Sequence, residues 1–158
     1  MSDTQLRRQL RDLLGWGDAH VTFEKAVKGM PPRLRGVVPP GLPHSAWQLV
    51  EHIRLAQADI LEFCVKRTYR HKKWPDAYWP KAPGPRHAAA WTRSLAAIRR
   101  DRRALRRLAS TRSIDLFARV PNGEGQTYLR EIILAADHEA YHVGQIVLVR
   151  RALGNWPD

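Results

Sequence analysis

DHEAYHVGQ, residues 137–145, lies inside a long run of periodically spaced apolar residues that extends from about residue 128 to residue 153. That spacing predicts one helix, on which residues four positions apart lie one turn above each other on the same face. His138 and His142 should therefore point the same way, about 6 Å apart, as two imidazole ligands of one metal ion would. The remaining ligands have to come from another part of the chain.

The length and the cysteine content limit the class of protein. A chain of 158 residues is long enough to form one domain that buries roughly two thirds of its unfolded surface, so we expect a single domain over residues 1–158. Cys64 is the only cysteine, which excludes an intrachain disulfide and a multi-cysteine zinc site. With no apolar N-terminal segment and no uncharged stretch of spanning length, we expect a cytoplasmic protein without a membrane span.

The net charge of +12 is a clear deviation from an ordinary composition. A dense group of arginines in the predicted third helix contributes to it: Arg99, Arg100, Arg102, Arg103, Arg106 and Arg107. Such a band is either a solvated helix face or an anion-binding surface, and the second case defines an alternative function, a basic helical module that binds nucleic acid or another polyanion. Because no recognition-helix or zinc-finger pattern accompanies the band, nucleic acid is not the favoured partner.

Apolar periodicity predicts three helices before the last one. The first extends from about residue 4 to 28 and is interrupted at Gly15-Trp16-Gly17, where two glycines cost about 2 kcal/mol in a helix interior relative to alanine. The second opens with an S-x-x-Q capping box at residues 45–48 and extends to about residue 70. The third extends from about residue 87 to 109.

The connection between the second and third helices decides the topology. Residues 71–86 contain Trp74-Pro75, Trp79-Pro80 and Pro83-Gly84-Pro85, so they cannot form regular structure. About 15 extended residues reach about 50 Å, more than the roughly 30 Å of a 20-residue helix. The chain can therefore return along the bundle and leave these two helices parallel. The prediction is an all-α four-helix bundle with one long crossover between helices 2 and 3.

His52 is the candidate third ligand. It lies three residues after Leu49 and four before Ala56, on or beside the inward stripe of the second helix. An unpaired buried imidazole costs about 1–3 kcal/mol, so His52 needs either a neighbouring hydrogen-bond partner or a shared metal. With His138 and His142 it makes a set of three protein ligands, which is typical of a catalytic metal site with an open position. All-imidazole ligation favours Zn²⁺ or Ni²⁺.

Two further residues are candidate catalytic groups. Gln145 follows the histidine pair and would orient a ligand or a bound water, or else bond to another helix. His20 lies on or beside the inward stripe of the first helix and would support the metal site or act as an acid or base; the alternative is a local hydrogen bond at the edge of the core. We expect Asp137 and Glu139 at the surface and His44 in a loop, not among the ligands.

Two short motifs, one opening the second helix and one in the last helix, carry a family resemblance. They are Trp47-x-Leu49-x₂-His52 and His138-x₃-His142-x-Gly144-Gln145. In order and placement the chain resembles the DinB-like (damage-inducible) family of metal-binding four-helix bundles over nearly its whole length. The resemblance implies an up-down-down-up topology, a homodimer, and His52, His138 and His142 as the metal ligands.

The same superfamily includes S-transferases that use low-molecular-weight thiols (bacillithiol, mycothiol and glutathione types) and metal-dependent hydrolases. The resemblance therefore implies a metal-dependent hydrolase or thiol S-transferase that acts on a small electrophilic substrate, with a low-molecular-weight thiol as a candidate cofactor. Many members carry a histidine just before the last ligand and an arginine just after it. Tyr141 and Val143 occupy those positions here, which leaves the substrate class open. A catalytically inactive metal-binding bundle is a further alternative.

Overall fold

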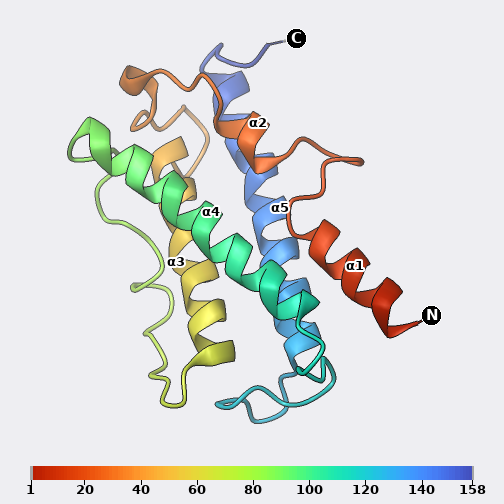
Figure 1. Ribbon diagram of the computed structural model, residues 1–158. Coiled ribbons are helices and arrows are strands. Elements are labelled where there is room, and N and C mark those ends of the chain that lie inside the picture. Colours follow the sequence, from red (N-terminus) through yellow and green to blue (C-terminus); the bar gives the residue numbers. More distant parts are fainter. Residues whose placement is uncertain (1, 158) are drawn as a thin grey trace.

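The computed structural model describes residues 2–157, and its regular structure in that range is helical. The elements are α1 (Asp3–Leu13), α2 (Phe23–Val27), the short 3₁₀ helix η1 (Pro32–Leu34), α3 (Ala46–Val65), α4 (Ala88–Ser110) and α5 (Tyr128–Ala152) (Figure 1). Within these residues there is no strand, only an isolated antiparallel bridge between Arg119 and Thr127. The predicted all-α class is confirmed. Across the same residues, no helix combines the length and apolar character needed to cross a membrane.

The three long helices form the centre of a bundle. α3 packs against both α4 and α5, while α1 packs mainly against α4 and α2 against α5. In Figure 1, α3 and α4 both run from the upper to the lower end of the molecule, and α5 runs back up between them and the N-terminal helices. The connection between α3 and α4 climbs along the outside of the bundle from the end of one helix to the start of the other (Figure 1).

The N-terminal helical region is divided into two helices. α1 ends at Leu13, and Gly15 has a φ of +117°, a region that glycine enters without the steric penalty of a Cβ atom. α2 begins only at Phe23, where the Thr22 side chain accepts a hydrogen bond from the backbone N–H of Lys25. The predicted break at the glycines is confirmed, and the second helix ends close to the predicted residue 28. The interruption is longer than predicted, because it extends from residue 14 to residue 22.

α3 begins with the predicted capping box. The backbone N–H of Gln48 donates to Ser45 Oγ at 3.2 Å, and the backbone N–H of Ser45 donates to Gln48 Oε1 at 3.0 Å. This defined start sets the register of the helix. Leu49, His52 and Ile53 consequently lie on the inward face, and all three are buried.

α3 ends earlier than predicted, at Val65 instead of residue 70. The Asn122 side-chain amide donates to the carbonyl of Lys66 at 2.6 Å and accepts from the backbone N–H of Tyr69 at 3.2 Å. Asn122, from a loop distant in the sequence, thus forms the hydrogen bonds that the carbonyl of Lys66 and the N–H of Tyr69 would otherwise make within a longer helix. The helix therefore ends at Val65.

The arginine band of α4 is not one solvated face. Arg102 is buried and donates to Glu139 of α5 at 2.8 Å, and Glu139 is buried as well. Arg99 forms an ion pair with Glu24 of α2 at 2.6 Å. The expectation that Glu139 lies at the surface is therefore wrong. This face of α4 packs toward α2 and α5, and a buried carboxylate needs a countercharge in contact with it.

Candidate metal centre

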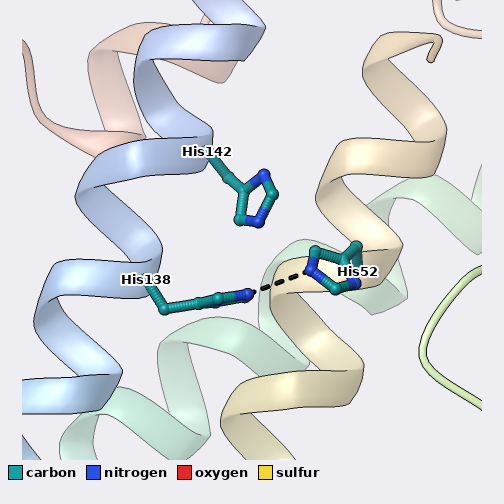
Figure 2. A group of neighbouring side chains, drawn as sticks. All are labelled: His52, His138 and His142. Atoms are coloured by element: carbon teal, nitrogen blue, oxygen red, sulfur yellow. Dashed lines mark hydrogen bonds between the residues drawn. The ribbon is translucent and has the colours of Figure 1, made fainter. Parts of the chain in front are cut away.

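α3 and α5 bring the three predicted histidines together. His52 comes from α3, and His138 and His142 come from consecutive turns of α5 (Figure 2). One ring nitrogen of each lies within 4.8 Å of the others, and the Nε2 atoms of His52 and His138 are 3.0 Å apart. Nitrogen ligands at 2.0–2.1 Å from a tetrahedral zinc ion are about 3.4 Å from one another. Small ring movements would therefore suffice for the three residues to share one ion.

The three imidazoles are neutral at physiological pH, as metal ligands must be. Burial lowers the pKa of His138 to about 4, with His142 and His52 adding to the effect. Burial likewise lowers the pKa of His142 to about 4. The pKa of His52 is also lowered, again chiefly by burial. Each ring therefore keeps a lone pair on one nitrogen, which is the chemistry that binding of a divalent ion requires.

Hydrogen bonds on the outer side orient two of the rings. His52 Nδ1 donates to the backbone carbonyl of Tyr78 at 2.9 Å, and His142 Nδ1 donates to Gln145 Oε1 at 2.7 Å. Because both partners are oxygen acceptors, the proton of each ring sits on Nδ1 and the lone pair is on Nε2, which in His52 faces Nε2 of His138. Bonds of this kind commonly fix the tautomer and direction of metal-bound histidines. Of the two roles that the sequence leaves open for Gln145, orientation of a ligand is the one that this contact supports.

An aromatic wall from the crossover connection covers one side of the group. Trp79 lies flat on His52, with 3.8 Å between ring centroids and 5° between ring planes. Trp74 meets His52 edge-on at 6.4 Å and remains 67% exposed. Tyr141 of α5 meets His142 edge-on at 4.9 Å and is 65% exposed. Two exposed aromatic rings thus flank the histidines from two different elements.

Asp59 of α3, which was not among the candidate residues from the sequence, anchors the crossover connection to α3. Its Oδ2 accepts hydrogen bonds from the hydroxyls of Tyr69, at 2.8 Å, and Tyr78, at 2.6 Å, and Lys72 Nζ lies 3.0 Å from Oδ1. Burial and the bond to Asp59 raise the pKa of Tyr78 to about 12, so its hydroxyl stays a donor. Tyr78 is therefore held at its hydroxyl by Asp59 and at its carbonyl by His52. A carboxylate seven positions after His52, on the same helix face, is the signal that could have revealed it.

His44 lies nearer the site than its position before the α3 cap suggested. Its ring stacks on Trp79 with a centroid distance of 4.0 Å, and the same indole also stacks on His52. It borders a small cavity of about 70 Å³ that Gln145 also lines. His44 Nδ1 is buried and has no hydrogen-bond partner within residues 2–157. A fourth imidazole thus lies one indole ring away from the candidate ligands, although it is not one of them.

His20 is not brought to the three histidines. It is exposed, and its Nδ1 donates to the neighbouring carbonyl of Val21 at 2.9 Å. It borders a cavity of about 270 Å³ on the back of α5, where Ala140 and Val143 also lie. At 3.6 residues per turn, these two positions are turned away from the face that carries His142. A local hydrogen bond is the alternative that the sequence left open for His20, and this is the contact observed.

Together these features define an all-helical bundle with a group of three neutral histidines that could hold a metal ion. The sequence model of the DinB superfamily matches residues 17–146, which is most of the chain and includes all three histidines. The chain belongs to the DinB superfamily, in agreement with the resemblance found in its motifs. The comparison with curated proteins and the comparison with solved structures each found no match.

Proposed function

We propose that this protein is a metal-dependent enzyme in which His52, His138 and His142 hold one divalent ion, Zn²⁺ or Ni²⁺. The observation that carries the proposal is the convergence of three imidazole nitrogens within 4.8 Å of one another. The donor set fits such an ion, because all three groups are neutral nitrogen donors, whereas Mg²⁺ and Ca²⁺ prefer oxygen. Three protein ligands also leave room for an exogenous one, which distinguishes catalytic from closed structural sites.

The proposed reaction is hydrolysis of a small electrophilic substrate, or transfer of a low-molecular-weight thiol to it. A divalent ion supplies Lewis-acid chemistry that acidifies a water or thiol and polarises an electrophile. Other residues of the chain orient and shield these histidines. Gln145 orients the ring of His142, and the Tyr78 carbonyl orients the ring of His52. Trp79 excludes water from one face of His52. The exposed rings of Trp74 and Tyr141 suit a substrate with an apolar part at the entrance.

We also propose a bundle topology, an oligomeric state and a cellular location for this protein. We infer an up-down-down-up bundle in which α1 and α2 together take the first position, supported by the directions of α3, α4 and α5 in Figure 1. A homodimer is supported by exposed apolar side chains along α5, Ile133, Tyr141 and Leu148. A cytoplasmic location is supported by the single free, buried Cys64.

Metal analysis of protein purified without a polyhistidine tag tests the assignment. The wild type should carry about one Zn²⁺ or Ni²⁺ per chain, as one site with three protein ligands requires. His142→Ala should lose the ion, whereas His20→Ala, which removes a histidine outside the group, should retain it. An unchanged metal content in His142→Ala would reject the proposal.

Activity assays on the metal-loaded protein then distinguish an enzyme from an inactive metal-binding bundle. Activity would be sought with a panel of activated esters, and with electrophiles in the presence of bacillithiol, mycothiol or glutathione. Turnover that disappears in His142→Ala and persists in His20→Ala supports the enzyme. Stoichiometric metal without any turnover across the panel supports the inactive metal-binding alternative.

A further inference from the structure

An open cleft of about 1030 Å³ lies between α3, α4 and the end of the crossover connection. On α3 it is bordered by Trp47, Glu51 and Arg54. At 3.6 residues per turn, these positions are turned away from the face that carries His52. The cleft is therefore a separate feature on the opposite side of α3 from the three histidines.

The cleft is strongly basic. Six of its lining side chains are cationic and one is a carboxylate, Glu51. The cations are Arg54, Lys81, Arg86, Arg93, Arg100 and Arg103. They come from α3, from the connection and from α4, so they surround one space from three directions. Charges gathered in a concave surface raise the local concentration of anions more than charges spread over a convex one.

Most of this charge has no carboxylate partner within residues 2–157, although Arg93 donates a hydrogen bond to His87 Nε2 at 3.1 Å. Arg54 is paired with Glu51 at 2.8 Å, and Arg100 with Asp101 at 2.8 Å. The Glu51 carboxylate is fully engaged, since it also accepts a hydrogen bond from Ser94 at 2.5 Å. Within residues 2–157, four of the lining cations form no ion pair: Lys81, Arg86, Arg93 and Arg103.

The cleft differs in this respect from the neighbouring face of α4. There Arg99 and Arg102 form ion pairs with Glu24 and Glu139, which connects α4 to α2 and α5. Those arginines stabilise the bundle. Arg103, on the cleft side, is exposed and forms no ion pair with another described residue. The arginine band thus separates into a face that holds helices together and a face that is free to bind a ligand.

The spacing of the cationic side chains and the apolar floor between them indicate which kind of ligand the cleft can bind. From Arg93 to Arg103 along α4 is about 15 Å, at 1.5 Å per residue, so one small anion would reach only part of the basic lining. Guanidinium groups bind phosphate oxygens in a bidentate manner. The space between the cations is apolar, with Trp47, Pro80 and Ala97 among its lining residues. A flat apolar group can be buried against such a surface.

We propose that this cleft binds a nucleotide-like ligand, which carries two or more phosphates beside a flat base. Two sources share this chemistry: a free nucleoside polyphosphate, and successive nucleotides of a single-stranded nucleic acid. The phosphates bind to the unpaired arginines, and the base packs against the apolar floor. The site is independent of the histidine group and of any ion held there.

Fluorescence anisotropy with the full-length protein tests the site. The probes are a fluorescent ATP analogue and a fluorescein-labelled oligothymidylate, each at about 50 mM and about 200 mM NaCl, because neutralised phosphates make the affinity salt-dependent. Saturable binding of the ATP analogue assigns a free nucleotide as the ligand. Saturable binding of the oligothymidylate without saturable binding of the ATP analogue assigns a nucleic acid. Absence of saturable binding of both probes at the lower salt concentration would overturn the proposal.

Paired variants separate the cleft from general positive charge. Arg93→Gln/Arg103→Gln removes two charges from the cleft, and the control Arg107→Gln/Arg112→Gln removes two exposed charges outside it. The cleft variant should weaken binding about tenfold or more, and the control less than about twofold, because only the cleft arginines contact phosphate. Equal weakening in both would overturn the proposal. Ala96→Glu, at an exposed lining position, is a second cleft variant with the same expected loss.

Two competitors test the remaining parts of the proposal. Where the ATP analogue binds, inorganic triphosphate should displace it less well than ATP does, because triphosphate lacks a base to pack on the floor. Equal displacement would overturn the assignment of the flat group. Chelation of metal ions with EDTA should leave the oligothymidylate affinity and the effect of the cleft variant unchanged, so this test can fail or succeed independently of the histidine site.

Discussion

Gln145 Oε1 accepts a hydrogen bond from Nδ1 of His142 at 2.7 Å, about one turn further along α5. The bond selects the tautomer of His142 in which Nε2 has a free lone pair. Because the same helix carries both residues, the ring direction is set by local geometry and does not depend on how α3 packs. We therefore expect Gln145 to act as a positioning residue for His142 in the candidate metal centre.

Gln145→Leu should weaken metal binding while the fold is retained. Leucine preserves the approximate size of the side chain but removes the acceptor, and loss of such an outer-sphere bond typically costs about 10–100-fold in affinity. Zn²⁺ affinity would be measured by competition with a chromophoric chelator. Gln145→Glu keeps an acceptor and should bind at least as tightly as the wild type. Equal affinity in the leucine variant and the wild type would refute this role.

Asp59→Asn should loosen the crossover connection. The change removes the charge that faces Lys72 and weakens an acceptor shared by Tyr69 and Tyr78, so we expect a loss of about 1–3 kcal/mol in the free energy of unfolding. Urea unfolding measures this loss, and hydrogen exchange should rise around Tyr78. Asp76→Asn, which removes only an exposed ion pair, should change stability by less than about 1 kcal/mol. Similar values for both variants would contradict the anchoring role.

The metal-free protein should lose stability as the pH falls from about 7 toward 4. The pKa values of His138 and His142 are about 4 in the folded protein, below the ordinary histidine value of 6.5. In that interval the unfolded chain binds protons that the folded one does not, so the free energy of unfolding falls as the pH falls. The contribution of these two histidines to that loss levels off below about 4.

Urea midpoints at a series of pH values measure this effect. His138→Gln/His142→Gln should flatten the dependence, whereas His20→Gln should leave it as in the wild type. Since protons compete with the ion for the same nitrogens, metal affinity should decrease over the same pH interval. A midpoint that is equally pH-dependent in the double variant and the wild type would show that other groups are responsible.

Arg102→Met should be among the most destabilising single changes on α4. It leaves Glu139 buried without its 2.8 Å partner, and loss of one member of a buried ion pair costs about 3–5 kcal/mol. Arg102→Met/Glu139→Leu removes both charges and should recover most of that loss. Arg103→Met, at the next and exposed position, should change stability by about 0.5 kcal/mol or less. Denaturant unfolding of the wild type, Arg102→Met, Glu139→Leu and the double variant gives the coupling energy, and simple additivity would argue against the pair.

Much of the helical structure and the candidate ligand set could be predicted because these features depend on residues close together in the chain. The capping box at Ser45 and the spacing of His138 and His142 are relationships over three or four positions, and helix geometry converts such spacing directly into direction. His52 was found because its place on an apolar stripe is visible in the sequence. The all-α class and the superfamily follow from the same local patterns.

The partners of the polar residues were decided only by tertiary packing. His52 meets the carbonyl of a residue 26 positions away, and Arg102 meets Glu139 across 37 positions. Whether a charged or polar side chain on a helix is solvated or buried depends on which element covers it, and neither periodicity nor spacing encodes that. For this reason Asp59 was overlooked and Glu139 was assigned to the surface. For the same reason the sequence left open whether His20 lies beside the ligands or makes a local hydrogen bond.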